Sequence, residues 1–134
     1  MTMTTYTKNK ILNHQFGKTA YTAAATLYVG LCTSVSAGGV VTGEPSGNGY
    51  ARVAITNSTD YFTTSTTGSL SNKAAVTFPA CTTTRWGTLA TIFVSDAASG
   101  DTNTLHYQAL AVPKTVEVGD APSIAIGALV FTQG

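Results

Sequence analysis

Charged side chains are scarce in this sequence, at 10% of residues against roughly 25% in typical globular chains. Seven lysines and arginines nearly balance six acidic residues, so the formal net charge is +1. The cations are spread between Lys8 and Lys114, which leaves too few in any region for a basic patch. The composition therefore argues against nucleic-acid binding through phosphate neutralisation.

Long apolar runs and cysteines are also few. The most apolar run covers residues 23–32 and is too short to cross a bilayer as a helix. No apolar segment of a secretory signal follows the polar residues 1–9, so we expect no membrane association. Without a secretory context, Cys32 and Cys81 are expected to be reduced core residues rather than a disulfide.

The sequence contains none of the common catalytic motifs. Gly-x-Ser-x-Gly is missing, and neither cysteine has a histidine nearby in sequence. His14 and His106 are the only histidines, so a metal site would need further ligands that converge in space. A hydrolase with paired carboxylates remains an alternative, because its two acids can lie far apart in sequence. We expect no catalytic, cofactor-binding or metal-binding residues, and no enzyme.

The glycine-rich stretch GEPSGNG, residues 43–49, raises the question of a phosphate-binding loop. Such a loop needs a lysine and then a serine or threonine after its last glycine, at the start of a helix. Here Tyr50, Ala51 and Arg52 follow and open a strand. The glycines are therefore expected to permit a turn into that strand.

Threonine-rich segments with a period of two make up most of the chain, and this pattern favours strands over helices. Residues 86–96 are apolar on both parities, which is typical of a central strand. Residues 34–49 are expected to form a loop, and residues 57–71 a loop or a weak edge strand. The expected strands are 24–33, 50–56, 74–80, 86–96, 104–113, 114–120 and 123–133. With no βαβ spacing, they predict an all-β fold, an antiparallel β-sandwich or barrel-like domain.

The N-terminal region differs from the rest. Residues 1–7 are polar and without periodicity, which predicts an extended N-terminal arm. Thr7 is then expected to cap a short helix over residues 8–16, with Gly17 as its stop. The domain organisation expected is thus an arm, residues 1–7, followed by a single β-rich domain, residues 8–134.

Arg52 and Trp86 are the side chains most suited to a contact surface. Arg52 should point away from the face formed by Ala51, Val53 and Ile55. It is then either a solvated strand residue or one half of a bidentate contact across a subunit interface. Trp86 is the only tryptophan, and core packing is favoured over a role as an interface anchor.

Several segments, taken in order, resemble small virion proteins of tailed bacteriophages that are labelled tail-fibre-like or head-decoration proteins. The resemblance runs from about residue 9 to residue 131 and is carried by NKILNHQFGKTAYTAAATLYVGLCTS, GYARVAI, NKAAVTFPA and WGTLATIFVSDAASGDTNTLHYQALAVPKTVEVGD. It implies a virion component made in the host cytoplasm, with no catalytic residues to transfer.

Two virion roles follow from this resemblance. A capsid decoration or cement protein suits a small single domain with an arm that can lie across a neighbour. We therefore expect the capsid surface rather than the tail, with the major capsid protein and further copies of the chain, as a homo-oligomer, for partners. The alternatives are a tail-fibre or receptor-binding module that contacts tail proteins, and a carbohydrate-binding β-sandwich that uses Tyr50, Tyr61, Phe62 and Tyr107.

The residues expected to contact neighbouring subunits come from the arm, the glycine-rich loop and the segment around the tryptophan. They are Met1, Thr2, Met3, Thr4, Thr5, Tyr6, Thr7, Gly47, Asn48, Tyr50, Arg52, Arg85 and Trp86.

Overall fold

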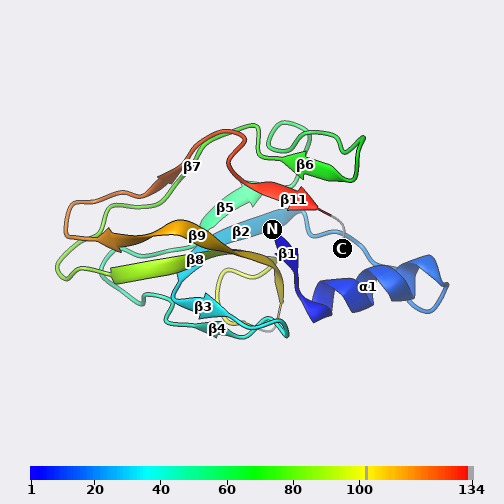
Figure 1. Cartoon of the computed structure of the whole chain (residues 1–134), viewed down its shortest axis with the longest axis horizontal. Coiled ribbons are helices and arrows are strands. Elements are labelled where there is room, and N and C mark those ends of the chain that lie inside the picture. Colours follow the sequence, from blue (N-terminus) through cyan, green and yellow to red (C-terminus); the bar gives the residue numbers. More distant parts are fainter. Residues whose placement is uncertain (102, 133–134) are drawn as a thin grey trace.

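The computed structural model describes residues 1–101 and 103–132 as an antiparallel all-β fold with one helix (Figure 1). The main sheet has the strand order β1–β9–β8–β2–β5. Its strands are β1 (Thr2–Met3), β2 (Thr26–Cys32), β5 (Val53–Thr56), β8 (Gly87–Ser95) and β9 (Thr104–Val116). Three two-stranded sheets pair β3 (Ser34–Val35) with β4 (Val41–Thr42), β6 (Ser69–Ser71) with β11 (Val130–Thr132), and β7 (Val76–Thr77) with β10 (Ser123–Ile124). The helix α1 spans Thr5–Gln15.

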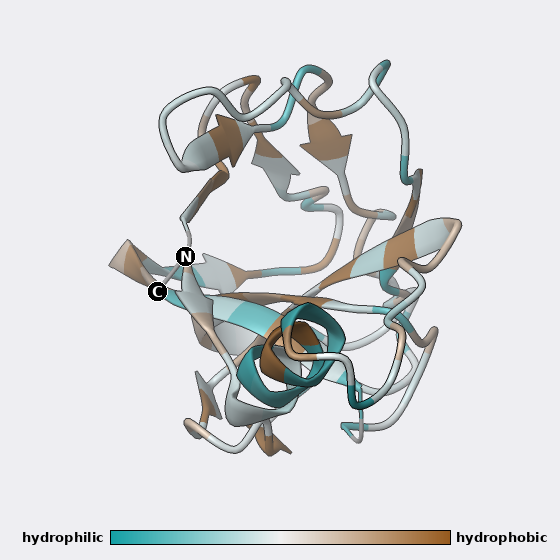
Figure 2. Cartoon of the chain, turned by 90° about the vertical axis from the view of Figure 1, so that its right-hand side faces the viewer, coloured by the Kyte–Doolittle hydropathy of each residue, from teal (hydrophilic) through white to brown (hydrophobic). Residues whose placement is uncertain are grey.

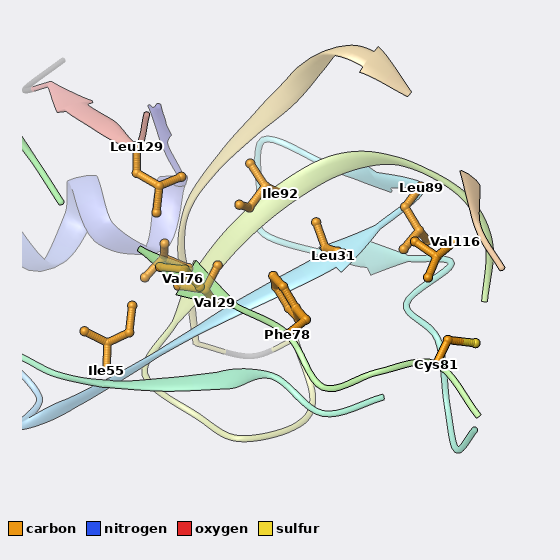
Figure 3. Packing of buried hydrophobic residues seen from close by; sticks show 11 residues of the cluster. Val29, Leu31, Ile55, Val76, Phe78, Cys81, Leu89, Ile92, Val116 and Leu129 are labelled. Carbon is orange, nitrogen blue, oxygen red and sulfur yellow. The ribbon is translucent and has the colours of Figure 1, made fainter. Parts of the chain in front are cut away.

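One face of the main sheet, here called the apolar face, carries the principal core. Because side chains alternate along a strand, Val29 and Leu31 of β2 project to the same side. They pack with residues from β7, β8 and the segments near β10 and β11 (Figure 3). The buried members are Val29, Leu31, Ile55, Val76, Phe78, Cys81, Leu89, Ile92, Val94, Val116 and Leu129. The β7–β10 and β6–β11 sheets thus cover this face and give the fold its sandwich character.

Strand β8 lies at the centre of the main sheet, as its sequence predicts, between β2 and β9. Its side chains from Thr91 to Ser95 are all buried. A register shift between Leu89 and Thr91 brings Leu89 onto the apolar face together with Ile92. Phe93 has the opposite parity, so it lies on the other face and is fully buried there.

The other face of the main sheet, here called the polar face, is covered by the β3–β4 hairpin and by loops (Figure 1). Phe93 is the large apolar side chain at its centre, beside Gly30 of the neighbouring strand. Hydroxyls hold the covering loops in place: Thr91 donates to the carbonyl of Thr33 at 3.1 Å, and Ser95 donates to that of Asn103 at 3.1 Å. On the polar face, hydrogen bonds from side chains to the backbone therefore hold the covering loops against the sheet, whereas apolar packing holds the covering strands on the apolar face.

Several element boundaries differ from those predicted. The expected loop over residues 34–49 contains the β3–β4 hairpin. The break expected after Pro113 is absent, and β9 continues through this residue. Pro113 lies on the outer edge of β9, where β1 pairs only with His106 and Tyr107. An edge strand tolerates proline, since the missing N–H leaves no ladder bond unmade. The single C-terminal strand expected over residues 123–133 is interrupted, so that β10 and β11 are separate.

The extended segment predicted over residues 1–7 is shorter than expected and lies against its own chain, because α1 begins at Thr5. Thr2 and Met3 pair with β9, and Thr4 rather than Thr7 caps α1, accepting the N–H of Thr7 at 3.3 Å. Thr4 also donates to the carbonyl of Thr104 at 2.6 Å, and Thr7 donates to that of Leu105 at 2.9 Å. Threonine hydroxyls thus attach this segment to its own chain, which no apolar pattern in the sequence indicates. The stop at Gly17 is confirmed, with φ at 71°.

The N-terminus also joins two sheets. The Met1 ammonium donates to the carbonyl of Val130 in β11, while the next two residues pair with β9. The main sheet and the β6–β11 sheet therefore meet along this line, which is the barrel-like side of the fold. Within the part of the chain that the structure describes, no helix has the length and apolar character needed to cross a bilayer.

Candidate functional site

The glycine-rich loop folds back on the strand that follows it and builds a compact polar cluster. The Glu44 carboxylate forms a bidentate pair with Arg52, with Nε–Oε2 and Nη2–Oε1 distances of 2.8 Å each. The Tyr50 hydroxyl donates to the same carboxylate at 2.7 Å and accepts the N–H of Leu31 at 3.1 Å. Three residues of one loop are therefore fixed to each other and to the edge of β2.

Arg52 extends this cluster to a second loop. Its Nη1 donates to the carbonyl of Ala97 at 2.9 Å, and its Nη2 to that of Gly100 at 2.6 Å. The guanidinium lies over the Phe93 ring, 4.7 Å from its centroid, an arrangement in which the ring quadrupole attracts the cation. With a side chain only 2% exposed, Arg52 is a clamp between loops, and the expectation of a solvated strand residue is wrong.

The bidentate contact suggested for Arg52 exists, but it is formed within the chain. Burial is the largest influence and lowers the pKa of Arg52, but the hydrogen bond and charge of Glu44, followed by Tyr50 and Cys32, together leave the pKa raised. Burial and then the Glu44 hydrogen bond raise the pKa of the Tyr50 phenol. The cluster is thus a fixed ion pair with a neutral phenol beside it at pH 7, with no proton poised for transfer.

Trp86 and the glycine turn complete the cluster. The Trp86 indole N–H donates to the carbonyl of Asn48 at 2.8 Å, and its ring meets that of Tyr50 edge-on, with centroids 5.2 Å apart. The turn needs positive φ at three successive residues, 71° at Gly47, 54° at Asn48 and 83° at Gly49, which explains the glycines. Trp86 packs against the principal core, so core packing is confirmed.

Sequence reasoning missed Glu44, which organises this cluster. The signal available was weak: Glu44 is the first acidic residue of the chain and lies eight positions before Arg52. Arg85, by contrast, forms only an exposed pair with Glu117 at 3.5 Å. Of the predicted contact residues, the structure therefore brings together Asn48, Tyr50, Arg52 and Trp86, with the arm segment elsewhere on β9.

The cluster borders an open cavity of about 440 Å³ whose lining includes Glu44, Ser46, Tyr50 and Ser99. The Glu44 carboxylate in this lining is already paired with Arg52 and hydrogen-bonded by Tyr50. Among the described residues, no group of three histidine, cysteine or acidic side chains is arranged to hold a metal ion. What the geometry provides is a rigid loop surface.

The titratable residues considered for chemistry are separated. His14 accepts the backbone N–H of Tyr21 at 3.0 Å through Nδ1. His106 lies on β9, where burial and then the nearby N-terminal ammonium lower its pKa to about 4. Cys32 and Cys81 are free and buried, which confirms the prediction of reduced core residues. Burial and then the Glu44 charge raise the pKa of the Cys32 thiol to about 12, so it is neutral at pH 7.

The aromatic residues considered for sugar binding do not share one exposed position. Tyr50 belongs to the polar cluster, and Phe62 packs edge-on against Phe131 with centroids 5.9 Å apart. Tyr61 is 38% exposed, and Tyr107 is half-buried beside β1. A sugar platform of stacked, exposed rings is therefore not what these four residues form.

Residues 2–132 match the family described as podophage GP4 fiber I protein gp80, and the chain therefore belongs to that family. No curated protein matches the chain. Membership identifies a small virion structural protein of a tailed phage, in agreement with the resemblance seen in the sequence.

Proposed function

We propose that this member of the podophage fibre protein family is a non-enzymatic structural component of a tail fibre. The observation that carries the proposal is the family match, which covers residues 2–132 and names a fibre protein. The polar cluster supports a structural role, because its charged side chains, Glu44 and Arg52, bond to each other and hold loops in place. A rigid loop surface suits a protein that contacts other virion proteins.

The family favours the fibre over the capsid decoration role that the small size of the chain led us to expect. One argument for the decoration role was a free arm that could clamp a capsid subunit. Residues 2–7 instead pair with β9 and form the start of α1. The proposed partners are accordingly other fibre and tail proteins, together with further copies of this chain, and the major capsid protein becomes the alternative.

Localisation on purified virions tests the proposal. Gold-labelled antibody against the recombinant chain should mark the tail region, and quantitative gels should give a copy number far below that of the major capsid protein. Labelling spread over the shell, with a copy number matching the capsid lattice, would instead establish decoration. An antibody against the major capsid protein provides the matched control for accessibility on the same particles.

A further inference from the structure

The end of α1 projects from one side of the molecule (Figure 1), and the helix seen end-on carries apolar as well as hydrophilic positions (Figure 2). Its apolar tip is here defined as Leu12 and Phe16. Leu12 is 51% exposed and Phe16 is 74% exposed, and side chains four positions apart lie on the same side of a helix. All residues from 12 to 20 are exposed. The turn that follows is nevertheless ordered, because Lys18 and Thr19 donate their N–H groups to the carbonyl of Asn13.

The projecting segment is also uniformly basic. Lys8, Lys10 and Lys18 belong to it, while all six acidic residues of the chain lie at or after Glu44. The ion pairs found among the described residues join Arg52 to Glu44 and Arg85 to Glu117, so the three lysines have no carboxylate partner there. An apolar tip flanked by such lysines fits an apolar recess with acidic groups at its rim.

The same molecule contains such a recess between β6, β11 and the segment after α1. It has a volume of about 210 Å³, and its lining includes Tyr21, Leu27, Phe62, Leu70, Val94 and Phe131. Because an engineered apolar cavity of about 150 Å³ accepts benzene, this recess has room for a phenyl ring. Phe16 of the same chain does not fill it, since that side chain is 74% exposed.

Two acidic residues follow or precede lining residues of this recess in the sequence, and one of them, Asp96, is close enough to influence the lining residue Tyr21. Asp96 lies two positions after the lining residue Val94. Burial, and then the charge of Asp96, raise the pKa of the phenol of Tyr21, another lining residue. The Oδ1 atom of Asp96 is buried and has no hydrogen-bond partner among the described residues. Asp60 precedes Phe62 by two positions and is exposed, with Lys73 bonded to the adjacent Thr59 carbonyl.

We propose that the apolar tip of one copy inserts into this recess of a second copy, with Phe16 as the anchor and the lysines of α1 facing Asp96 and Asp60. Tip and recess are different patches, so the contact is heterologous and leads to a closed ring or an open chain of copies. The inference rests on the proposed function in that a fibre component acts in several copies. It specifies which surfaces meet.

Three variants test the contact by analytical ultracentrifugation over a concentration series. Wild type should associate, and Phe16→Ala should raise the dissociation constant about 30-fold, because buried aromatic anchors dominate interface energies. Ala24→Trp, which fills the recess at a lining residue, should weaken association similarly. Ile126→Ala removes an equally exposed apolar side chain (66%) outside both patches and should leave association unchanged. Circular dichroism checks that each variant is folded, with Ala23→Trp replacing Ala24→Trp if the latter unfolds.

Mixing two deficient variants gives the sharpest outcome. Phe16→Ala retains the recess and Ala24→Trp retains the tip. At a concentration where neither variant associates alone, their mixture should therefore form heterodimers. Association of wild type should also weaken as salt is raised. A wild type that stays monomeric at every soluble concentration, or a mixture that forms no heterodimer, would overturn the proposal. Since virion localisation is measured separately, a monomeric chain found on the tail would reject this contact and leave the fibre role intact.

Discussion

Phe78 and Phe93 are both at most 2% exposed, and they lie on opposite sides of the main sheet in different surroundings. Phe78 is packed among aliphatic side chains from several strands (Figure 3). Phe93 is covered by a guanidinium, which Glu44 and two backbone carbonyls hold in place. The apolar face depends mainly on burial, with buried Asn72 bonding the segments that cover it. The polar face depends mainly on directed bonds among residues far apart in sequence.

This difference has a consequence for tolerance to change. Hydrophobic packing is non-directional, so the apolar face should accept exchanges that conserve volume. A buried ion pair leaves an uncompensated charge when either partner is removed. The polar face should therefore be sensitive to the identity of single residues, among them Arg52, which holds Glu44 of the glycine-rich loop.

The largest effect is expected on the apolar face. Phe78→Ala should lower the free energy of unfolding by about 4 kcal/mol, because it removes a fully buried aromatic ring and leaves a cavity. Chemical denaturation at pH 7 measures this directly. Val112→Ala, at an exposed position of β9, is the control and should change the free energy by less than about 0.5 kcal/mol. Equal losses in the two variants would contradict the assignment of the core.

On the polar face, Glu44→Gln should cost about 3 kcal/mol, since Arg52 keeps its buried charge without a counter-ion. Arg85→Ala breaks the exposed pair with Glu117 and should cost less than about 0.5 kcal/mol, a loss that disappears in high salt. Denaturation at low and high salt compares the two pairs. A Glu44→Gln variant as stable as wild type would mean that the clamp contributes little.

The stability of the protein is expected to depend on pH through His106, which lies at the edge of the apolar face and meets the Phe131 ring edge-on. Burial, then the N-terminal charge, lowers the pKa of His106 to about 4, against about 6.5 in an unfolded chain. Between these values the unfolded state binds more protons, so stability is full above pH 6.5 and falls as pH drops towards 4. Allowing for solvent screening of a partly exposed group, we expect a loss of about 2 kcal/mol.

The variant His106→Phe separates this contribution from that of the carboxylates, which titrate in both proteins. The difference in stability between wild type and variant should change across pH 6.5 to 4 and stay constant above pH 7. Thermal unfolding followed at several pH values gives the comparison. Parallel pH profiles for the two proteins would show that the histidine does not carry the effect.

The smallest effect expected is at the contact between β2 and Phe93. A methyl group at Gly30 would overlap the Phe93 ring, which cannot move away because it is fully buried under Arg52. Gly30→Ala should therefore cost about 1 to 2 kcal/mol through overpacking. In a Phe93→Leu background, Gly30→Ala should lower the free energy of unfolding by less than it does in the wild-type background. A double-mutant cycle with no coupling would reject this explanation.

Much of the fold could be predicted from local pattern. The alternation in β2 and β5 and the two-sided burial of β8 were readable, because a buried face imposes a period of two on the chain. The attachment of residues 1–7 to the rest of the chain cannot be predicted locally, because the hydroxyls of Thr4 and Thr7 bond to carbonyls about a hundred residues away. Such bonds leave no periodicity in the sequence.

The candidate site was only partly predictable. The sequence indicated a glycine turn and singled out Arg52 and Trp86, but it left open which groups they meet. Only the fold brings Glu44, the Ala97 carbonyl and the Phe93 ring around one guanidinium. A long side chain can reach any of several neighbours, and the neighbour is decided by which loops the sheet brings together.

The all-β class, the low charge and the resemblance to phage virion proteins can be recognised in the amino-acid sequence alone, which also favours reduced cysteines. These follow from composition and from short-range alternation, which are properties of the chain at each position. The tertiary structure decided the attachment of residues 2–7 to β9, the pairing of Arg52 with Glu44 and the exposure of Phe16. These features depend on contacts between segments that are distant in sequence. Such contacts stabilise the protein only after the sheet has brought the segments together.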